Sequence, residues 1–328
     1  MNLRAVSTSP TFGYFAAEPV EYLRSRGFDI VLAPQGKKWS EQDLIEATKE
    51  YDAMIVGIEK ISAPVLQASK KLRIITKHGA GVDNINVEIA SAKGIVVTSA
   101  PGANSDAVAD LTLGLFLSLA RTIPFADRSI REGKWPRLAG VELNRKTLGI
   151  IGLGQIGKKV AKRGLGFDMS VLVYDVVQDG DFARRSGARY VSLEELLTRS
   201  DFVSIHVPLL PATHRLIGER ELLLMKEDAF LVNISRGNIV DEEALYEVLK
   251  KKRIRGAALD VFSQEPPAGS PLLSLDNVVL TPHMGGYTVE ALMETGMICV
   301  NNIVDLFEGR SPRFMVNPEV MKRNKQTE

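Results

Sequence analysis

The chain has 328 residues, a length that favours two domains. Its 41 Lys and Arg nearly balance its 40 Asp and Glu, so its charge gives no reason to expect a nucleic acid or an anionic membrane as a partner. The single cysteine, Cys299, excludes an internal disulfide and a metal site built from several cysteines.

The first hundred residues alternate short β-branched runs with helix-compatible stretches. Such runs are typical of strands buried in a parallel sheet. The chain enters the first run without the apolar core of a signal peptide, so we expect a cytoplasmic protein. The expected strands are Leu3–Ser7, Asp29–Leu32, Ala53–Ile58, Arg73–Lys77 and Ile95–Thr98, and the expected helices are Glu18–Ser25, Glu41–Thr48, Ala63–Ser69 and Ser105–Arg121.

A second alternating series starts near Thr147 and ends before a long helix expected at Thr288–Phe307. Two helix starts in it are well marked, because Ser192–Glu195 has the pattern of a capping box and Asp241–Ala244 places acids at a positive helix end. Both halves of the chain therefore predict doubly wound α/β units. The further strands expected in this series are Val171–Tyr174, Phe202–Val207, Ala229–Ile234, Gly256–Leu259 and Val278–Thr281.

A glycine-rich sequence, Gly152-Leu-Gly154-Gln-Ile-Gly157, lies between the first strand of this series and a helix-compatible stretch. In a dinucleotide-binding turn the first glycine allows the tight turn, the second lets the backbone approach a pyrophosphate, and the third lets helix and strand pack closely. The helix N-terminus offers its N–H groups to the phosphates. Asp175 ends the next strand, where a carboxylate accepts hydrogen bonds from the adenosine ribose and disfavours a 2′-phosphate. The sequence therefore predicts NAD as the cofactor.

Three side chains suited to catalysis follow consecutive strands of the second series: Arg236, Glu265 and His283. Open α/β sheets bind their ligands at the carboxyl ends of the strands. A guanidinium can hold a carboxylate through two parallel hydrogen bonds. An imidazole beside a carboxylate has its protonated form stabilised, which suits a proton donor at neutral pH. The spacing alone leaves open whether the three side chains converge, since Arg and Glu in loops are usually only solvated.

Together these motifs resemble the D-2-hydroxyacid dehydrogenase family, and within it the short D-3-phosphoglycerate dehydrogenases of serine biosynthesis. The resemblance covers nearly the whole chain and implies an NAD-dependent oxidoreductase that interconverts a D-2-hydroxy acid and its 2-keto acid. It is carried by the Gly152–Gly157 fingerprint and by the segments His78–Asn84, His206–Pro208, Asn233–Gly237, Leu259–Phe262, Glu265–Pro266 and Pro282–Gly286.

The resemblance implies a role for each strand-end residue. Arg236 would bind the substrate carboxylate and polarise the reacting oxygen, His283 would donate or accept the proton, and Glu265 would orient His283. Backbone N–H groups of Ala80 and Gly81 would also hold the substrate carboxylate, which a glycine-rich turn makes sterically possible. The cofactor-binding residues implied by the resemblance are Gly152, Gly154, Gln155, Ile156, Gly157, Asp175, His206, Val207, Pro208, Ile234, Ser235, Arg236, Asp260, His283, Gly285 and Gly286.

The resemblance also implies a fold and an assembly. A Rossmann-type NAD-binding domain at residues 101–287 would be inserted into a flavodoxin-like substrate domain made of residues 1–100 and about 288–328, with the active site in the cleft between them. The mid-chain position of the fingerprint agrees with this arrangement, because a complete α/β unit precedes it. Members of the family are typically homodimers through their NAD-binding domains, so we expect a homodimer.

One segment departs from the pattern of the phosphoglycerate enzymes, which commonly place an Arg-Ser pair after the third strand to contact the substrate. This chain has Gly57-Ile58 there, and Lys60 is the nearest cation. The resemblance still favours 3-phosphoglycerate as the substrate, and the alternatives are glyoxylate or hydroxypyruvate, D-lactate, a sulfonated hydroxy acid and phosphite. Formate-oxidising relatives replace the glutamate of the catalytic pair, so the presence of Glu265 favours a 2-keto acid.

Other interpretations stay open beside this one. An NAD-sensing binding protein similar to a co-repressor is the alternative class, since such relatives can retain Arg236, Glu265 and His283. His206 and His214 lack carboxylate or cysteine partners at a useful spacing, so no metal is expected. His78 precedes a glycine turn and fits a place near the substrate as well as a structural role.

Overall fold

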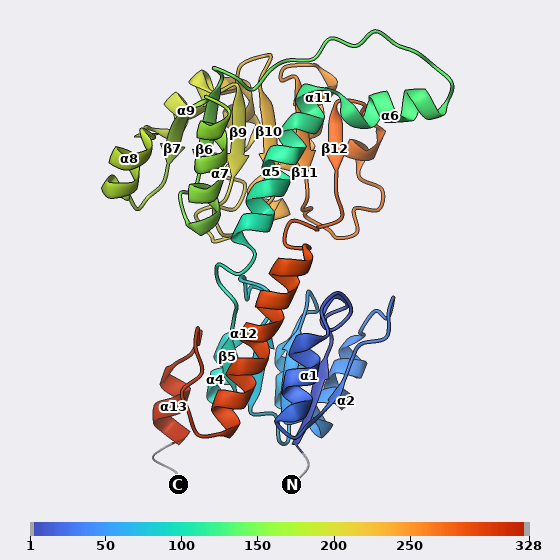
Figure 1. The fold of residues 1–328 in the computed structure, drawn as a ribbon, viewed down its shortest axis with the longest axis vertical. Helices are drawn as coiled ribbons and strands as arrows, with labels where there is room; N and C mark the ends of the chain where they lie inside the picture. Colours follow the sequence, from blue (N-terminus) through green and yellow to red (C-terminus); the bar gives the residue numbers. More distant parts are fainter. Residues whose placement is uncertain (1–2, 325–328) are drawn as a thin grey trace. The chain divides into compact units, whose positions relative to one another are not determined.

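The computed structural model describes residues 3–324, and the chain packs as two compact units. The first unit holds the residues up to Asn104 and those from Gly286 onward, and the second runs from Ser105 to Gly285. Each unit is built around its own parallel β-sheet (Figure 1). The second unit is therefore an insertion in the sequence of the first.

The sheet of the first unit has its strands in the order β2-β1-β3-β4-β5, and every pair is parallel. This 2-1-3-4-5 order is that of flavodoxin-like doubly wound folds. β3, β4 and β5 are buried along their whole length, which accounts for their continuous apolar sequences. The strands are β1 (Leu3–Ser7), β2 (Phe28–Val31), β3 (Ala53–Val56), β4 (Ile74–Lys77) and β5 (Val96–Thr98).

Helices cover both faces of this sheet. On one face, Val300 and Ile303 of α12 pack in the same core as Phe28 and Ile74 of the strands. On the other face, α2 begins at Ser40, whose side chain accepts the N–H of Asp43 while Asp43 accepts the N–H of Ser40. The helices are α1 (Glu18–Ser25), α2 (Glu41–Glu50), α3 (Ala63–Gln67), α4 (Val87–Ala92), α12 (Val289–Phe307) and α13 (Glu319–Asn324).

The segment after α12 is tied to the edge strand of the same sheet by one buried amide. Asn317 accepts the backbone N–H of Val97 at 2.8 Å and donates to the Ile95 carbonyl and the Ser91 hydroxyl, both at 2.9 Å. Phe314 supplies a further carbonyl to Ser99. These contacts complete the first unit with residues that lie more than two hundred positions apart in the sequence.

The sheet of the second unit has the order β12-β11-β10-β9-β6-β7-β8, and its pairs are parallel. Counted from β6 as the first strand, the order contains 3-2-1-4-5-6, which is that of dinucleotide-binding folds. The predicted fold class is confirmed. The strands are β6 (Thr147–Ile151), β7 (Ser170–Tyr174), β8 (Arg189–Tyr190), β9 (Phe202–Ile205), β10 (Phe230–Asn233), β11 (Gly256–Leu259) and β12 (Val278–Leu280).

Helix α5 and the glycine helix α7 share one core of this unit, in which Phe116 meets Phe202 edge-on at 5.2 Å between ring centroids. Two 3₁₀ turns, Gly237–Ile239 and Pro271–Ser274, connect the later elements. The helices are α5 (Ser105–Ala120), α6 (Ile123–Arg131), α7 (Gln155–Gly166), α8 (Gly180–Ser186), α9 (Leu193–Arg199), α10 (Glu219–Leu224) and α11 (Glu242–Lys250).

The helices within residues 3–324 are short or interrupted by charged residues. None of these helices is by itself long and apolar enough to cross a bilayer. Only α5 and α6 taken together meet the requirement, across a bend of 62°.

The sequence-based boundaries agree with the structure at Leu3–Ser7, Glu18–Ser25 and Gly256–Leu259. The strand expected at Phe202–Val207 ends earlier, at Ile205, because the backbone turns at the edge of the sheet and His206 begins a loop. At Ser192 the expected helix start is present, and the Ser192 side chain accepts the Glu195 N–H. The short strand β8 and the helix α6 were not predicted.

Candidate active site

The fingerprint forms the turn between β6 and α7. Gly152 has φ +96°, and a Cβ there would lie 2.8 Å from the backbone carbon of His206. A Cβ at Gly157 would lie 2.1 Å from the Gly152 carbonyl oxygen. Both positions therefore require glycine for reasons of packing within the protein.

Gly154 differs from these two, because a Cβ there would meet nothing within 4 Å. Packing inside the protein does not explain this glycine, whereas the close approach of a bound phosphate does. Gln155 and Ile156 follow as the first residues of α7, so their N–H groups lie at the positive end of the helix. The turn thus fits the diphosphate of a dinucleotide.

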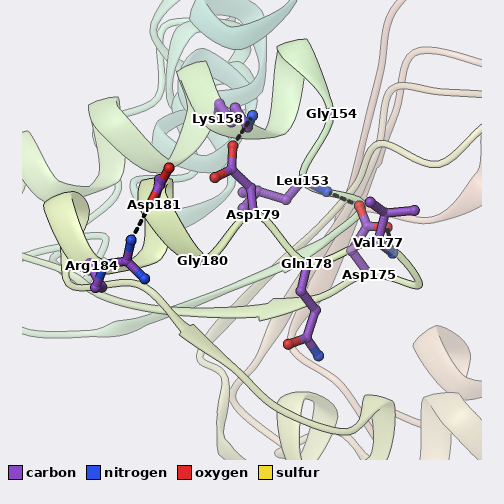
Figure 2. A pocket seen from close by; sticks show the side chains of 10 residues that line it. All are labelled: Leu153, Gly154, Lys158, Asp175, Val177, Gln178, Asp179, Gly180, Asp181 and Arg184. Atoms are coloured by element: carbon purple, nitrogen blue, oxygen red, sulfur yellow. Dashed lines mark hydrogen bonds and ion pairs between the residues drawn. The ribbon is translucent and has the colours of Figure 1, made fainter.

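Asp175 lies beside this turn at the end of β7, in a pocket of about 610 Å³ (Figure 2). The N–H of Leu153 donates to its Oδ2 at 2.6 Å and the N–H of Val177 to its Oδ1 at 2.9 Å, which fixes the carboxylate. The pocket is the place that the sequence predicts for the adenosine ribose. Its lining residues are Leu153, Gly154, Lys158, Asp175, Val177, Gln178, Asp179, Gly180, Asp181 and Arg184.

His206, Val207 and Pro208 leave the sheet at the end of β9, next to the fingerprint. The His206 N–H donates to the Ile151 carbonyl at 2.7 Å, and its Nε2 lies 2.6 Å from the Ser204 hydroxyl. Burial lowers the pKa of His206 to about 3, so its ring is neutral at physiological pH. Among residues 3–324, no group of three or more His, Cys, Asp or Glu side chains is arranged to hold a metal ion.

The turn after β10 carries Ile234, Ser235 and Arg236. The Asn233 side chain braces this turn by accepting the N–H of Ser235 at 3.2 Å and donating to the carbonyl of Arg236 at 2.9 Å. A Cβ at Gly237 would overlap the backbone of Phe262, at 1.9 Å from its carbonyl carbon. The turn that presents Arg236 therefore lies directly against the segment that leads from β11 to Glu265.

His283 and Glu265 form a hydrogen-bonded pair. Nδ1 of His283 lies 2.8 Å from Oε2 of Glu265, and their side chains are 37% and 28% exposed. Burial acts to raise the pKa of Glu265, but the hydrogen bond and charge of His283, the Phe262 N–H and the charge of Arg236 hold it below its usual value. Glu265 and His283 thus meet, and the charge of Arg236 acts on the same carboxylate.

Asp260 holds the loop that presents His283. Its Oδ1 accepts the Thr281 hydroxyl at 2.6 Å and the Met284 N–H at 2.9 Å, and its Oδ2 accepts the Gly285 N–H at 2.8 Å. Burial raises the pKa of Asp260, against the effect of these hydrogen bonds. Sequence reasoning placed Asp260 beside the nicotinamide and overlooked Thr281, although this threonine stands two residues before His283. The geometry makes Asp260 a brace for the His283 loop.

The remaining candidates lie in the first unit. Ala80 and Gly81 follow β4, within a turn in which Gly79 has φ +154°. His78 precedes them, and its Nδ1 lies 3.1 Å from the Ser9 hydroxyl and 3.4 Å from that of Thr11. Of the expected cofactor-binding residues, Gly286 also belongs to the first unit, whereas Gly285 is the last residue of the second.

The fold and these residues define a dinucleotide-binding α/β protein with an Arg, a Glu and a His at the carboxyl edge of its cofactor sheet. Residues 113–285 match the model of the D-isomer specific 2-hydroxyacid dehydrogenase NAD-binding domain. The chain belongs to the D-isomer specific 2-hydroxyacid dehydrogenase family, and its second unit is the family's NAD-binding domain.

Similar proteins carry two different substrate names. A D-3-phosphoglycerate dehydrogenase from Methanocaldococcus jannaschii is 45% identical over 85% of this chain, which spans only 54% of that protein. A glyoxylate reductase from Korarchaeum cryptofilum is 43% identical over 90% of this chain and 91% of its own length. The crystal structure of the TT0316 protein from Thermus thermophilus superposes with a TM-score of 0.88 at 35% identity, covering 96% of this chain and all of that one. The chain thus spans about half the length of the phosphoglycerate enzyme.

Proposed function

We propose that this protein is an NAD-dependent dehydrogenase that interconverts a D-2-hydroxy acid and the corresponding 2-keto acid. The observation that carries the proposal is the hydrogen-bonded pair of His283 and Glu265, with Arg236 close enough to lower the pKa of the glutamate. These groups belong to the same sheet as the dinucleotide turn. Bound there, NAD supplies the acceptor or donor of a hydride, and the protein supplies binding, orientation and proton transfer.

His283 would transfer the proton. Its Nδ1 is occupied by Glu265, so Nε2 is the atom that would donate a proton to the ketone oxygen or accept one from the alcohol. The carboxylate of Glu265 stabilises the protonated ring and holds its orientation, as a carboxylate does for other catalytic histidines. Phe262 in turn holds the glutamate, because its N–H donates to Oε1 at 3.1 Å.

Arg236 would bind the carboxylate of the substrate through its guanidinium, which can form two parallel hydrogen bonds to such a group. The braced turn at Asn233 fixes the backbone from which this side chain projects. The N–H groups of Ala80 and Gly81 would be further donors to the substrate carboxylate. In this assignment Arg236 binds the substrate carboxylate and polarises the reacting oxygen, whereas His283 transfers the proton.

Two substrate classes are candidates. The resemblance and one of the similar proteins support 3-phosphoglycerate, while the surroundings of Gly57 favour a small 2-keto acid such as glyoxylate. A Cβ at Gly57 would lie 3.0 Å from Cα of Ser9, so an arginine there would displace the backbone. The carboxylate of Glu59 stands beside it, accepting the Gly57 N–H at 3.0 Å and the Thr8 hydroxyl at 2.8 Å. A phosphate would be repelled by this anion. The ammonium of Lys77 is also close, but it donates to the Gly57 carbonyl and, at 2.9 Å, to the Asn84 amide oxygen, and Lys60 is exposed.

We also propose a homodimer in the cytoplasm. Helix α6 and the segment after it, which Figure 1 shows leading away from the sheet of their unit, expose several large apolar side chains. Such an exposed group is typical of a protein–protein interface. The side chains are Ile123, Phe125, Ile130, Trp135 and Leu138, with Trp135 77% exposed.

A spectrophotometric panel tests the proposal. Glyoxylate, hydroxypyruvate, phosphohydroxypyruvate and pyruvate are supplied with NADH, and 3-phosphoglycerate and phosphite with NAD. We expect turnover of 2-keto acids, with kcat/KM for glyoxylate or hydroxypyruvate at least about tenfold above that for the phosphorylated acid, as the loss of one charged contact predicts. A higher kcat/KM for phosphohydroxypyruvate than for glyoxylate or hydroxypyruvate would instead favour the phosphorylated acid as the substrate. Binding of NADH without turnover of any acid would refute the enzyme and support the NAD-sensing alternative.

A further inference from the structure

The pocket beside Asp175 contains an ion pair that the dinucleotide motif does not include (Figure 2). Nζ of Lys158, in the first turns of α7, lies 2.6 Å from Oδ2 of Asp179, in the loop that precedes α8. The two side chains are 37% and 36% exposed, and both line the pocket. Lys158 is the cation that an additional phosphate on the ribose would recruit from α7.

Asp179 is held in place by contacts on three sides. Its Oδ1 accepts the Phe182 N–H at 2.9 Å, which makes it the N-cap of α8. Its own N–H donates to the Tyr190 hydroxyl at 2.8 Å. The hydrogen bond from Lys158 is the main cause that lowers the pKa of Asp179, so this carboxylate is ionised at neutral pH. The carboxylate therefore competes for Lys158 from a fixed position.

The charges that line the pocket sum to one negative charge. Asp175, Asp179 and Asp181 face two cations, Lys158 and Arg184, and each cation is already paired, Lys158 with Asp179 and Arg184 with Asp181. A phosphate monoester carries about −1.5 to −2 charges at pH 7. Entry of such a group would meet the fixed carboxylate of Asp175 and no cation free of an acidic partner among the lining residues.

We propose that Asp179 is a second determinant of the preference for NAD over NADP, acting by holding Lys158 in an ion pair so that its charge is not available to a 2′-phosphate. The inference rests on the proposed function, since it requires that the pocket receive the adenosine end of the cofactor. Asp175 then disfavours the phosphate directly, whereas Asp179 removes the cation that could compensate for it. The preference is therefore set by two acids on the same loop, four residues apart.

The substitution Asp179→Asn tests the proposal without removing the helix cap. Asparagine keeps an oxygen for the Phe182 N–H and is as good an N-cap as aspartate, but it has no charge. We expect the Kd for NADPH, measured by cofactor fluorescence on the purified protein, to fall about tenfold, which corresponds to about 1.4 kcal/mol. The Kd for NADH should change by less than about twofold. An unchanged Kd for NADPH would overturn the proposal.

Two further variants separate the release of Lys158 from a simple change in net charge. In Asp179→Asn combined with Lys158→Gln, the gain in NADPH affinity should disappear, and a gain that persists would overturn the proposal. The matched control is Asp106→Asn, which removes the partner of Lys159, the next residue on the same helix, whose side chain does not line the pocket. An equal gain in that control would show a general charge effect and would also overturn it.

The single variant Lys158→Gln tests the proposal even if Asp179→Asn does not fold. Removing Lys158 also leaves Asp179 without its cation, so the Kd for NADPH should rise, but by less than about threefold because the lysine is already paired. A rise of about tenfold would mean that the lysine already serves a phosphate and would overturn the proposal. The wild-type protein separates this inference from the proposed function. If NADH itself does not bind, the proposed function fails, whereas NADH binding with unaltered cofactor discrimination in the variants refutes only the role of Asp179.

Discussion

Each unit carries a histidine beyond the carboxyl end of a parallel strand, and the two histidines have opposite surroundings. His78 follows β4 of the first unit, with its Nδ1 3.1 Å from the Ser9 hydroxyl and its ring edge-on to Phe12. His283 follows β12 of the second unit, with its Nδ1 2.8 Å from Glu265. His206, after β9 of the second unit, likewise lies beside a hydroxyl, that of Ser204. Of these three strand-end histidines, His283 is the one paired with a carboxylate.

The neighbouring loops produce this difference. Burial lowers the pKa of His78 to about 4, and the charge of Lys77 acts in the same direction, so the ring is neutral at pH 7. The loop after β11 instead brings an anion to His283. A histidine at the carboxyl edge of a sheet thus becomes a candidate acid or base only when another loop supplies its charged partner. Substitutions at the two sites test this contrast.

The largest effect is expected from His283→Ala. Without the imidazole no group carries the proton, so kcat for 2-keto acid reduction should fall by about 100-fold or more, while the Kd for NADH changes little. Steady-state kinetics and a fluorescence titration measure the two quantities. His214→Ala, at an exposed histidine of the same unit, is the matched control and should leave kcat unchanged. Near-normal turnover in His283→Ala would remove His283 from the mechanism.

A smaller effect is expected from Glu265→Gln. Glutamine has one carbonyl oxygen, so it can accept from His283 or from the Phe262 N–H but not from both, and it lacks the charge that stabilises a protonated ring. We expect kcat to fall about 30-fold with KM nearly constant, because a contribution confined to the transition state lowers kcat and kcat/KM together. A rise in KM with an unchanged kcat would instead assign Glu265 to substrate binding.

Arg236→Lys should affect binding more than the chemical step. Lysine keeps the charge but cannot form two parallel hydrogen bonds to a carboxylate. The loss of one charged hydrogen bond predicts a decrease of about 20-fold in kcat/KM, mainly through KM. The KM for a series of 2-keto acids measures it. If kcat alone decreased, Arg236 would act on the reacting oxygen rather than on the carboxylate.

The sequence predicted the parts of the site that are local. The fingerprint, Asp175 and the three strand-end residues stand at positions that the alternation of strands and helices defines, so their place at the sheet edge followed from the pattern. Gly237 also lay inside a recognised motif, but the sequence did not show why a glycine is needed there. It is needed because the backbone of Phe262 lies where a Cβ would be, which depends on how two loops pack.

The contacts between loops were the part that could not be predicted. Asp260 joins three groups of the His283 loop, and Lys158 pairs with Asp179 across 21 positions of sequence. The residues of these pairs are not separated by a helical or strand period, so the hydrophobic pattern of the sequence does not predict the contacts. Helix α6 was also missed, although its sequence is strongly amphipathic. Side-chain partners of this kind hold the His283 loop and carry the proposed role of Asp179.

The smallest predicted effect concerns the neutral histidine, and it is on stability. The pKa of His78 is about 4 in the folded protein and 6.5 as its ordinary value. Between these values the unfolded chain binds more protons than the folded one, so stability is retained above about pH 6.5 and lost as the pH falls toward 4. Between about pH 7 and 5.5 this amounts to about 1 kcal/mol from His78.

Urea unfolding of the first unit measures this loss, with Trp39 as the reporter once Trp135→Phe has removed the other tryptophan. In His78→Gln the decrease in unfolding free energy between the two pH values should be smaller by about 1 kcal/mol. The comparison uses slopes rather than absolute stabilities, because glutamine also alters the contacts with Ser9 and Thr11. An identical slope would mean that the His78 ring takes up a proton in the folded state. The contrast with His283 would then rest on hydrogen-bond partners alone.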